Sequence, residues 1–287
     1  MLVVLAGGAA AVVVAEEKIE HVIAPETGAL RPPEGEWIRS VPGRTAEVWA
    51  VADADPPRSG RVAGLIRRAD PDRILYLGDV YPTGTRDDFD RWAKPWGGLV
   101  RKMAPTPGNH EWPEAREGYE PFWREVTGET PPTYYSFRAG GWDVLSVNGE
   151  HSDWRAAESW LLDQASSGGN CRIGFWHRPA YSAGKYGRGD ERAREYWEAL
   201  AGAARIVVTG HDHDFQRLRP RDGIVQFIAG AGGRHLHDVD EDDPQLAFGD
   251  DEHFGALRLR LSPEQARWRF VAAGGRVLDK GSLFCRA

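Results

Sequence analysis

Short apolar runs that predict β-strands alternate with amphipathic runs that predict helices over the first two-thirds of this chain. Runs rich in β-branched residues, such as "RILYLG" at 73–78 and "RIVVTG" at 205–210, are typical of buried strands. Between such runs, "SGRVAGLIRRA" at 59–69 and "ERAREYWEALAGA" at 191–203 have the periodicity of helices. This alternation favours an α/β core.

The last third of the chain has a different pattern, because strand-like runs follow one another with only short turns between them. These runs are "GIVQFIAG" at 223–230, "GALRLRLS" at 255–262 and "ARWRFVAA" at 266–273. A succession of strands without intervening helices is typical of antiparallel pairing. We therefore expect a second, more antiparallel sheet that extends the α/β core.

Several residues predict where individual elements begin, end or turn. Ser59 and Asp153 are candidate N-caps, because their side chains can accept a hydrogen bond from the first turn of a helix. Pro95 predicts a break in the helix that begins near Thr85. Gly140 and Gly141 divide "TYYSFRAGGWDVLSVN" into two strands and predict a hairpin.

Five predicted strands are each followed by acidic, amide or imidazole side chains. The residues in question are Asp53 and Asp55 after 46–52, Asp79 after 73–78, Asn109, His110 and Glu111 after 101–107, His177 after 172–176, and His211 and His213 after 205–210. In open α/β sheets, ligands bind beyond the carboxyl ends of the strands. We therefore expect these side chains to meet in one site.

The pair His211 and His213 is the most informative of these groups. Residues two apart in an extended segment point to the same side, so both imidazole rings can face one point. Imidazole is the commonest side-chain ligand of transition metals. A carboxylate between two cations offsets their repulsion, and neutral imidazoles and an amide oxygen complete each shell without excess charge. The set of residue types thus favours a centre with two metal ions.

Four sequence blocks resemble those of a known family. "GDVY" at 78–81, "GNHE" at 108–111, "WHRPAYS" at 176–182 and "GHDH" at 210–213 are, in this order, similar to the calcineurin-like metallophosphoesterases. The longer stretches "GNHEW", "HRPAYSAG" and "GHDHDFQR" resemble the purple acid phosphatase branch most. The resemblance runs from about Glu47 to Arg217. It implies two stacked mixed β-sheets flanked by helices, a four-layer α/β/β/α sandwich.

The resemblance also implies a role for each matching residue. Asp79 would bridge two metals, with Asp53 and His213 on one metal and Asn109, His177 and His211 on the other. His110 would contact the substrate phosphate and help to protonate the leaving oxygen, and Glu111 would hold it. Asn109 and Tyr181 would also contact substrate. Lys185 and Arg188, farther along the same segment, either line the mouth of the site or belong to a solvated loop.

Two departures from the family pattern leave the last ligand of the first metal open. Most of the superfamily has His two residues after the first Asp, and Asp55 stands there. The purple branch has a ligand Tyr three residues after the bridging Asp, but here Tyr81 comes one residue early and Pro82 stands in its place. Ligation by Tyr81 would favour Fe³⁺, whereas ligation by Asp55 would favour Mn²⁺ or Fe over Zn. The expected cofactor is iron paired with Zn, Mn or Fe.

These residues predict a two-metal phosphohydrolase that acts on a small phosphorylated substrate. Metal-bound hydroxide would attack a phosphate monoester, with His110 assisting the leaving group. A phosphodiesterase of the same superfamily is the alternative. A non-enzymatic phosphate or metal binder is a third hypothesis. His235 and His237 lie in "GGRHLHDVDEDD", which has the charge pattern of an acidic surface loop.

Composition limits the partners and the cellular compartment. A net charge of −7 over 287 residues argues against a nucleic-acid partner. The apolar start "MLVVLAGGAAAVVVAEE" resembles a signal-peptide core and is short for a membrane span. We expect a secreted or periplasmic protein without a stable membrane anchor, the alternative being a cytoplasmic one with an N-terminal strand. The two cysteines, Cys171 and Cys285, are either free buried thiols or one disulfide.

The expected organisation has three parts. Residues 1–15 form the signal-like apolar segment, and residues 16–45 form an extended lead-in rich in Pro and Gly towards its end. Residues 46–287 form the metallophosphoesterase domain.

Overall fold

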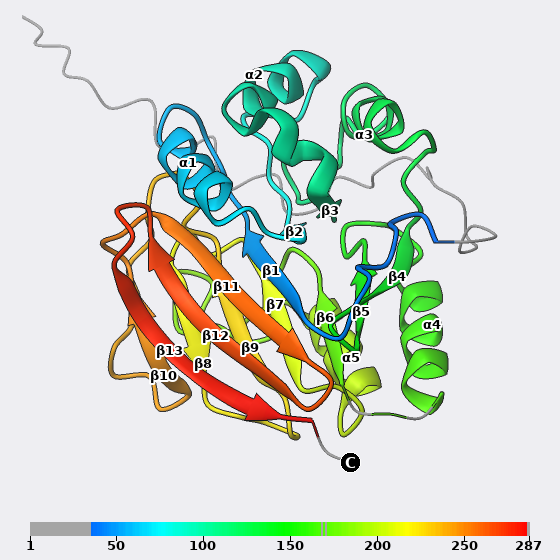
Figure 1. Cartoon of the computed structure of the whole chain (residues 1–287), viewed down its shortest axis with the longest axis vertical. Helices are drawn as coiled ribbons and strands as arrows, with labels where there is room; N and C mark the ends of the chain where they lie inside the picture. The colour runs from blue at the N-terminus through cyan, green and yellow to red at the C-terminus, as the bar shows by residue number, and fades with distance from the viewer. Residues whose placement is uncertain (1–35, 168, 170, 286–287) are drawn as a thin grey trace, which may run out of the picture.

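The computed structural model of the chain describes residues 36–167, 169 and 171–285. The expected signal-like segment and most of the lead-in lie outside these residues. Two β-sheets dominate the described part (Figure 1). The first has the strand order β13-β12-β11-β1-β2-β3, and the second has the order β10-β8-β9-β7-β6-β5-β4.

Both sheets are mixed: the parallel pairs lie at the β3 edge of the first sheet and in the middle of the second. The first contains β1 (Ala46–Val51), β2 (Arg73–Tyr76), β3 (Met103–Pro105), β11 (Gly255–Ser262), β12 (Gln265–Ala272) and β13 (Val277–Phe284). The second contains β4 (Tyr134–Ala139), β5 (Trp142–Val147), β6 (Arg172–Phe175), β7 (Ile206–Thr209), β8 (Phe215–Leu218), β9 (Val225–Ala229) and β10 (Leu246–Asp250). The pairs β1–β2, β2–β3, β5–β6, β6–β7 and β7–β9 are parallel.

Helices cover the outer faces of the two sheets. These helices are α1 (Ser59–Ala69), α2 (Arg86–Trp96), the 3₁₀ helix η1 (Gly97–Lys102), α3 (Tyr119–Thr127), α4 (Trp154–Ser166) and α5 (Glu191–Leu200). Helices α1, α2 and α3 lie on one side of the molecule and α4 and α5 on the other (Figure 1). The predicted fold of two stacked mixed sheets flanked by helices is therefore confirmed.

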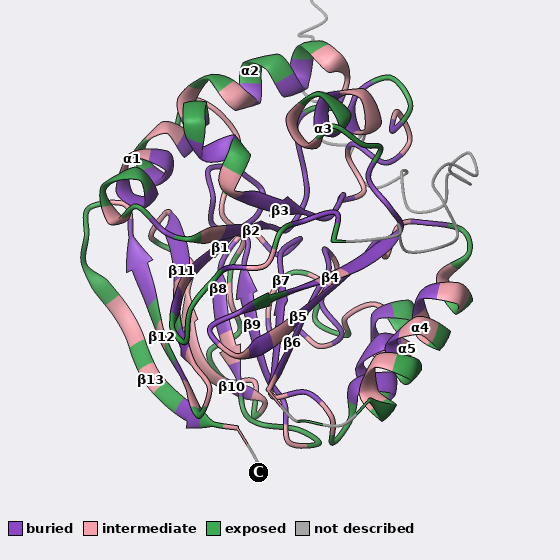
Figure 2. Cartoon of the chain, turned by 45° about the vertical axis from the view of Figure 1, so that its right-hand side comes forward, coloured by how far each residue is buried: buried purple, intermediate pink, exposed green. Residues whose placement is uncertain are grey.

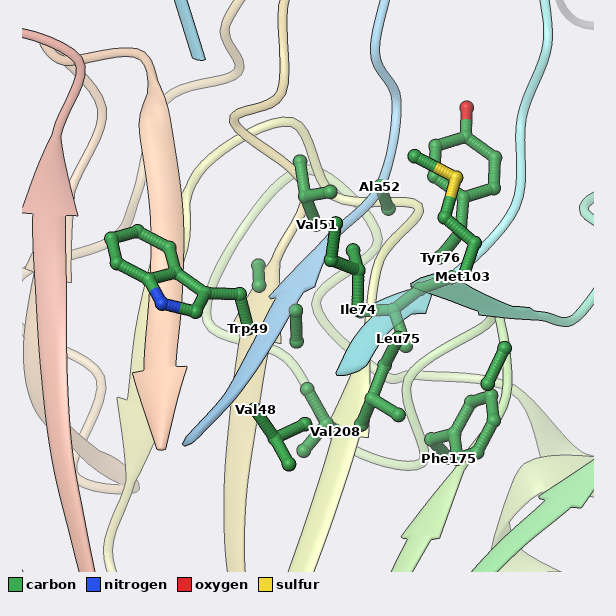
Figure 3. Packing of buried hydrophobic residues seen from close by; sticks show 14 of the residues in the cluster. Val48, Trp49, Val51, Ala52, Ile74, Leu75, Tyr76, Met103, Phe175 and Val208 are labelled. Carbon is green, nitrogen blue, oxygen red and sulfur yellow. The ribbon is translucent and has the colours of Figure 1, made fainter. Parts of the chain in front are cut away.

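Side chains that alternate along a central strand pack into two different cores, one between the sheets and one under the helices. On β7, Ile206 and Val208 belong to the core between the sheets, whereas Val207 belongs to the cluster under α4 and α5. Figure 3 shows part of the inter-sheet core, in which side chains of both sheets, such as Val48 and Val208, gather in one cluster. The edge strand β13 is mostly exposed or half-buried (Figure 2). Period-two alternation thus places an apolar face on both sides of the central strands.

The local predictions were mostly confirmed. Asp153 caps α4 by accepting a hydrogen bond from the backbone N–H of Ala156 at 3.2 Å. Gly140 and Gly141 form the hairpin turn between β4 and β5, with φ values of 58° and 87°. Helix α2 includes Pro95 and ends at the next residue. The Ser59 cap was wrong, because α1 already begins at Ser59 and no side chain caps it.

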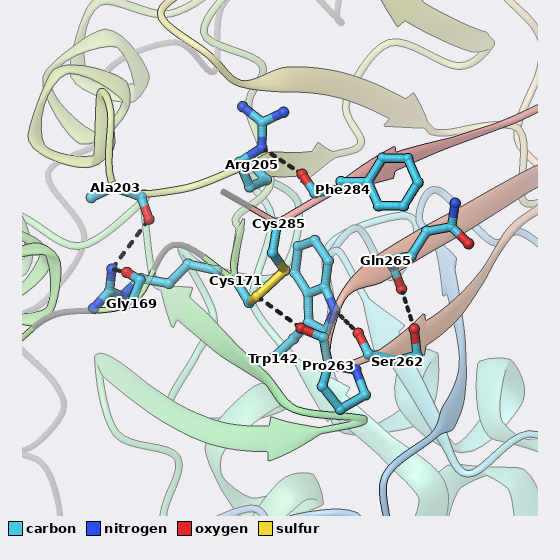
Figure 4. The surroundings of a disulfide bond; sticks show 11 residues. Trp142, Gly169, Cys171, Ala203, Arg205, Ser262, Pro263, Gln265, Phe284 and Cys285 are labelled. Carbon is cyan, nitrogen blue, oxygen red and sulfur yellow. Dashed lines mark hydrogen bonds between the residues drawn. A yellow bond between two sulfur atoms is a disulfide. The ribbon is translucent and has the colours of Figure 1, made fainter. Parts of the chain in front are cut away.

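A disulfide joins the two sheets at one end. Cys171 lies directly before β6 of the second sheet, and Cys285 lies directly after β13 of the first (Figure 4). The bond closes a loop with a sequence separation of 114 residues. Of the two possibilities for these cysteines, the structure has the disulfide.

Removing this disulfide is expected to lower the free energy of unfolding by roughly 2–5 kcal/mol, because the open chain gains conformational entropy when it unfolds. The measurement is urea unfolding of the double variant Cys171→Ser, Cys285→Ser against the wild type. A phosphine reductant should lower the free energy of unfolding of the wild type to that of the variant. The same reductant should leave the free energy of unfolding of the variant unchanged. Equal stability of the two oxidised proteins would contradict the prediction.

Candidate metal centre

The carboxyl ends of parallel strands from both sheets meet at one place. Asp53 and Asp79 lie just beyond β1 and β2 of the first sheet. His177 and His211 lie just beyond β6 and β7 of the second sheet. Because neighbouring parallel strands end at the same edge of their sheet, the loops that follow them converge.

The converging side chains form two groups that share one carboxylate. Asp79, His177 and His211 make the first group, and Asp53, Asp79 and His213 make the second. Within each group, the potential ligand atoms lie within 4.8 Å of one another. The Oδ1 atom of Asn109 is 3.1 Å from Nε2 of His177, which places this amide beside the first group. The arrangement fits two cations on either side of Asp79.

Three of these residues have an uncommon backbone conformation. The φ angles of Asp53, Asp79 and His211 are 56°, 65° and 71°, in the left-handed region that non-glycine residues rarely adopt. Elsewhere in the described part of the chain, only Asp70 and Asp222 share this feature among non-glycine residues. Such conformations cost on the order of 1–3 kcal/mol each and cluster at functional sites.

The backbone of His211 corrects the expectation of an extended segment at 211–213. The chain bends at His211, and the two histidines reach different groups. They converge because of this bend and not because of strand periodicity.

Close contact between the loops after β2 and β3 requires glycine. A Cβ atom on Gly108 would lie 2.1 Å from Oδ1 of Asp79, and one on Gly78 would lie 2.5 Å from the backbone nitrogen of Gly108. The same Oδ1 atom accepts a hydrogen bond from the backbone N–H of His110 at 3.1 Å. The two loops therefore touch through their backbones and fix the orientation of Asp79.

Backbone carbonyls orient two of the histidines. Nδ1 of His177 is 2.7 Å from the carbonyl oxygen of Leu77, and Nδ1 of His213 is 2.8 Å from that of His235. A carbonyl only accepts, so each Nδ1 carries the hydrogen and each Nε2 is directed to the centre. Burial and the neighbouring charge of Arg178 hold the pKa of His211 well below its usual range. His211 is therefore neutral, the form that binds a metal.

Asp79 and His177 form a buried ion pair in the absence of metal. Burial raises the pKa of Asp79, but the charges of His177 and His110 outweigh burial and bring this pKa well below its usual range. Burial lowers the pKa of His177, but Asp79 outweighs burial and raises it to about 10. Oδ1 of Asp79 lies 3.3 Å from Nε2 of His177.

The structure places Tyr81, and not Asp55, at the second group. The hydroxyl of Tyr81 lies 2.9 Å from Oδ1 of Asp53, 3.0 Å from Oδ2 of Asp79 and 2.9 Å from Nε2 of His213. Asp55 instead forms an ion pair with Arg234, with Oδ2 and Nη1 3.1 Å apart. Asp55 therefore lies in neither group of potential ligands. Burial and Asp53 raise the pKa of Tyr81 well above its usual range, so the metal-free site holds a phenol.

His110 lies at the mouth of the centre and belongs to neither group. Its ring packs on Tyr81 with centroids 4.4 Å apart, and its side chain is 23% exposed. Nδ1 is 2.6 Å from the carbonyl oxygen of Pro82, and Nε2 is 3.9 Å from Oδ2 of Asp79. The carbonyl fixes the hydrogen on Nδ1 and so orients Nε2 towards Asp79.

Glu111 does not hold His110 as we expected. Its carboxylate accepts hydrogen bonds from the backbone N–H groups of Asp79 and Val80, each at 3.0 Å. The side chain is fully buried, and burial together with the charge of Asp79 raises its pKa to about 8. Glu111 therefore positions the loop that carries Asp79, and its assignment as a catalytic group is corrected.

Tyr181 also lies elsewhere than expected. Its ring packs on Trp197 with centroids 5.3 Å apart and lies under the guanidinium of Arg221, in a separate cavity of about 170 Å³. Tyr186, five residues later, stacks on His211 with centroids 4.2 Å apart. The sequence analysis expected a tyrosine of this loop at the site and named Tyr181. The structure places Tyr186 there instead. Nη1 of Arg178 lies 3.5 Å from Nε2 of His211, and the guanidinium of Arg234 lies over the Tyr81 ring. The sequence analysis missed both arginines, because no spacing rule singles them out.

Replacing Glu111 is expected to destabilise the protein through the Asp79 loop. In Glu111→Gln, an amide NH₂ group would face a backbone N–H group, and one buried donor would lose its acceptor. The expected loss in free energy of unfolding is about 1–3 kcal/mol, measured by urea denaturation. Glu117→Gln, at an exposed position nearby, is the matched control and should change stability little. Equal effects of the two substitutions would show that Glu111 has no such role.

Metal binding is expected to release protons at neutral pH. His177 and Tyr81 are both protonated in the metal-free site, and both must lose a proton to bind a cation. Affinity should therefore fall as pH is lowered. Calorimetric titration with Zn²⁺ in two buffers of different ionisation enthalpy counts the protons. Tyr81→Phe should release fewer protons than the wild type, whereas Tyr196→Phe, away from the centre, should match it. Heats that do not depend on the buffer would contradict the prediction.

No helix in the described part of the chain is both long and apolar enough to cross a membrane.

The chain is 26% identical over 138 residues to tartrate-resistant acid phosphatase type 5 of Mus musculus, a match that covers 45% of this chain and 42% of the relative. The chain thus spans less than half the length of this curated relative.

Two solved structures are similar in fold. Purple acid phosphatase PPD1 from yellow lupin (Lupinus luteus) seeds matches with a TM-score of 0.72 at 17% identity, over 85% of this chain and 55% of that one. GAP50, described as the anchor in the inner membrane complex of Plasmodium, matches with a TM-score of 0.67 at 14% identity, over 85% and 90%.

One family model matches the segment that carries the centre. The model for calcineurin-like phosphoesterases matches residues 50–215, which is more than half of the chain. This segment contains both aspartates, the amide and all three histidines of the two groups. The chain therefore belongs to the calcineurin-like phosphoesterase family.

Proposed function

We propose that this chain hydrolyses phosphate monoesters at a centre of two metal ions. The observation that carries the proposal is the place of Asp79 in both groups of potential ligands, since one carboxylate between two cations is what a dinuclear centre requires. The membership of the chain in the calcineurin-like phosphoesterase family supports phosphoester chemistry. The similarity to tartrate-resistant and purple acid phosphatases favours monoesters.

The two sides of the centre differ in donor chemistry. One ion would bind Asp79, Asn109, His177 and His211, and the other would bind Asp53, Asp79, Tyr81 and His213. The second set contains two carboxylates and a phenol, which suits Fe³⁺, whereas the first suits Zn²⁺, Mn²⁺ or Fe²⁺. When bound, the two ions would lower the pKa of the attacking water and stabilise the charge that develops on the phosphate oxygens.

His110 is placed to serve the leaving group. Its Nδ1 hydrogen is held by the carbonyl of Pro82, so the ring is fixed and Nε2 faces Asp79. As an imidazolium, this atom donates a proton to the ester oxygen as the bond to phosphorus breaks. Neither ligand group contains His110, so this proton remains available whichever metals are bound.

The disulfide supports the further proposal that the chain works outside the cytoplasm. Disulfides persist in oxidising compartments and are rare in the cytosol. The bond between Cys171 and Cys285 joins both sheets of the fold. It is consistent with the signal-like sequence at the N-terminus.

The first test is hydrolysis of p-nitrophenyl phosphate by metal-stripped protein before and after addition of iron, manganese or zinc. Added metal is expected to restore turnover, and bis(p-nitrophenyl) phosphate should be cleaved more slowly. Hydrolysis of the diester alone would replace the monoesterase by a diesterase. If no ester is cleaved with any ion, the chain is a binder that retains the fold.

His110→Ala is expected to lower kcat roughly 10²- to 10⁴-fold, because the leaving oxygen loses its proton donor. Metal content, measured by mass spectrometry of the loaded protein, should stay the same because the ligands are intact. The matched control is His253→Ala, whose ring pairs with Asp250 outside the centre. Loss of metal from His110→Ala, or unchanged turnover, would refute the role assigned to His110.

A further inference from the structure

A second cavity opens directly beside the candidate centre. Its volume is about 620 Å³, and His213 lines it, so one ligand of the centre forms part of its wall. The other walls come from the loop after β1, the loop after His177 and the segment 234–238. A cavity of this size accommodates a small organic group attached to a phosphate bound at the centre.

Cationic side chains predominate in this cavity. Arg58, Lys185 and Arg234 line it, against the carboxylates of Asp55 and Asp238. This local excess of positive charge contrasts with the net charge of −7 of the whole chain. His235 and His237, from the segment with the charge pattern of a surface loop, also line the cavity.

Arg234 is held in a fixed position between the cavity and the centre. Its backbone N–H donates to the carbonyl oxygen of Asp53 at 2.8 Å. Its guanidinium carbon lies 4.3 Å from the centroid of the Tyr81 ring, and Nη1 pairs with Asp55. Stacking on an aromatic face and an ion pair restrict the side chain before any ligand arrives, so little entropy is lost on binding.

Lys185 approaches the cavity from the other sheet. It lies in the loop after His177, next to Tyr186, which stacks on His211. The ammonium nitrogen is 5.5 Å from the Tyr186 ring centroid, and the ring of Tyr186 in turn lies 5.9 Å from that of His237. Buried contacts fix this loop, because Asp212 accepts a hydrogen bond from the backbone N–H of Tyr186 at 3.3 Å. A flexible ammonium and a fixed guanidinium thus line the same cavity.

The role that these cations serve follows from the charge balance of the site. The scissile phosphate would be neutralised by two metal ions, so it does not need the cations of the adjoining cavity. A neutral leaving group would gain nothing from an arginine and a lysine in its pocket. A second anionic group on the substrate would pair with both, since guanidinium forks match carboxylate and phosphate oxygens.

We propose that Arg234 and Lys185 bind a second anionic group of the substrate, so that the preferred substrates are phosphate esters with a further phosphate or carboxylate. This inference rests on the proposed function and extends it to a substrate class. Arg234 and Lys185 are then specificity-determining residues, separate from the proposed metal ligands and from His110.

Three aryl phosphates test the proposal with the metal-loaded protein. Phenyl phosphate has one anionic group, and p-carboxyphenyl phosphate and hydroquinone bisphosphate each have two. The measured quantity is the ratio of kcat/KM for each probe with two anionic groups to that for phenyl phosphate. In Arg234→Gln and in Lys185→Gln this ratio is expected to fall roughly tenfold, mainly through KM, because a charged hydrogen bond is lost. In Arg234→Lys the ratio should fall less than in Arg234→Gln, because the positive charge remains although the bidentate guanidinium is lost.

Control variants and the metal content make the outcomes separable. Lys94→Gln and Arg101→Gln remove exposed cations of α2 and η1 and should leave the ratio as in the wild type. A larger fall for the bisphosphate assigns the cavity to phosphate, and a larger fall for the carboxylate probe assigns it to carboxylate. Hydrolysis of phenyl phosphate with ratios that do not change in either variant, at wild-type metal content, would overturn the inference alone. Absence of hydrolysis of all three probes by the wild type would overturn the proposed function, and the inference with it.

Discussion

The orientation of Asp79 is the constraint on which the candidate centre depends. This carboxylate is buried, and burial of a charge is costly unless partners offset the loss of water. The backbone N–H of His110, the ring of His177 and the hydroxyl of Tyr81 surround it. Glu111, also buried, holds the backbone on which Asp79 sits. The glycines at 78 and 108 leave room for this packing, and substitution of either would push the two loops apart.

Two buried carboxylates so close together explain the electrostatics of the site. Asp79 keeps its charge because His177 pairs with it, and burial together with the charge of Asp79 raises the pKa of Glu111 to about 8. Part of the positive charge that two metal ions would bring is thus supplied in the metal-free protein by a proton on His177. Metal ions and protons therefore compete for the same buried side chains around Asp79.

The sequence predicted the parts of the site that depend on strand order. Asp53, Asp79, His177 and His211 follow strand ends, and the convergence of parallel strands is a property of α/β sheets that no side-chain detail alters. Alternation of strand and helix patterns predicted the α/β core, whereas the two stacked mixed sheets were expected from the family resemblance. The expected separate antiparallel sheet was wrong, because β11, β12 and β13 extend the sheet of β1 and β9 pairs in parallel with β7. The hairpin at Gly140 and the cap at Asp153 were also predictable, because each depends on a few neighbouring residues.

The errors concern side chains whose direction is set by contacts between distant segments. Glu111 is next to His110 in sequence, but its carboxylate finds two N–H groups in the loop after β2. Asp55 pairs with Arg234, from which it is separated by 179 residues in the sequence. Tyr181 and Tyr186 share one loop, and contacts with Trp197 and Arg221 hold Tyr181 away from the centre. No local pattern could have distinguished these outcomes.

The division of ligands between the two sheets determines when the centre can form. The first group takes Asp79 from the first sheet and its two histidines from the second, and the second group takes two aspartates from the first sheet and His213 from the second. A chain with only one sheet folded therefore completes neither group, even when Tyr81 is counted with the second. Each complete set of ligands forms only after the two sheets have docked. Metal content then becomes a record of how many molecules in a preparation have completed their assembly.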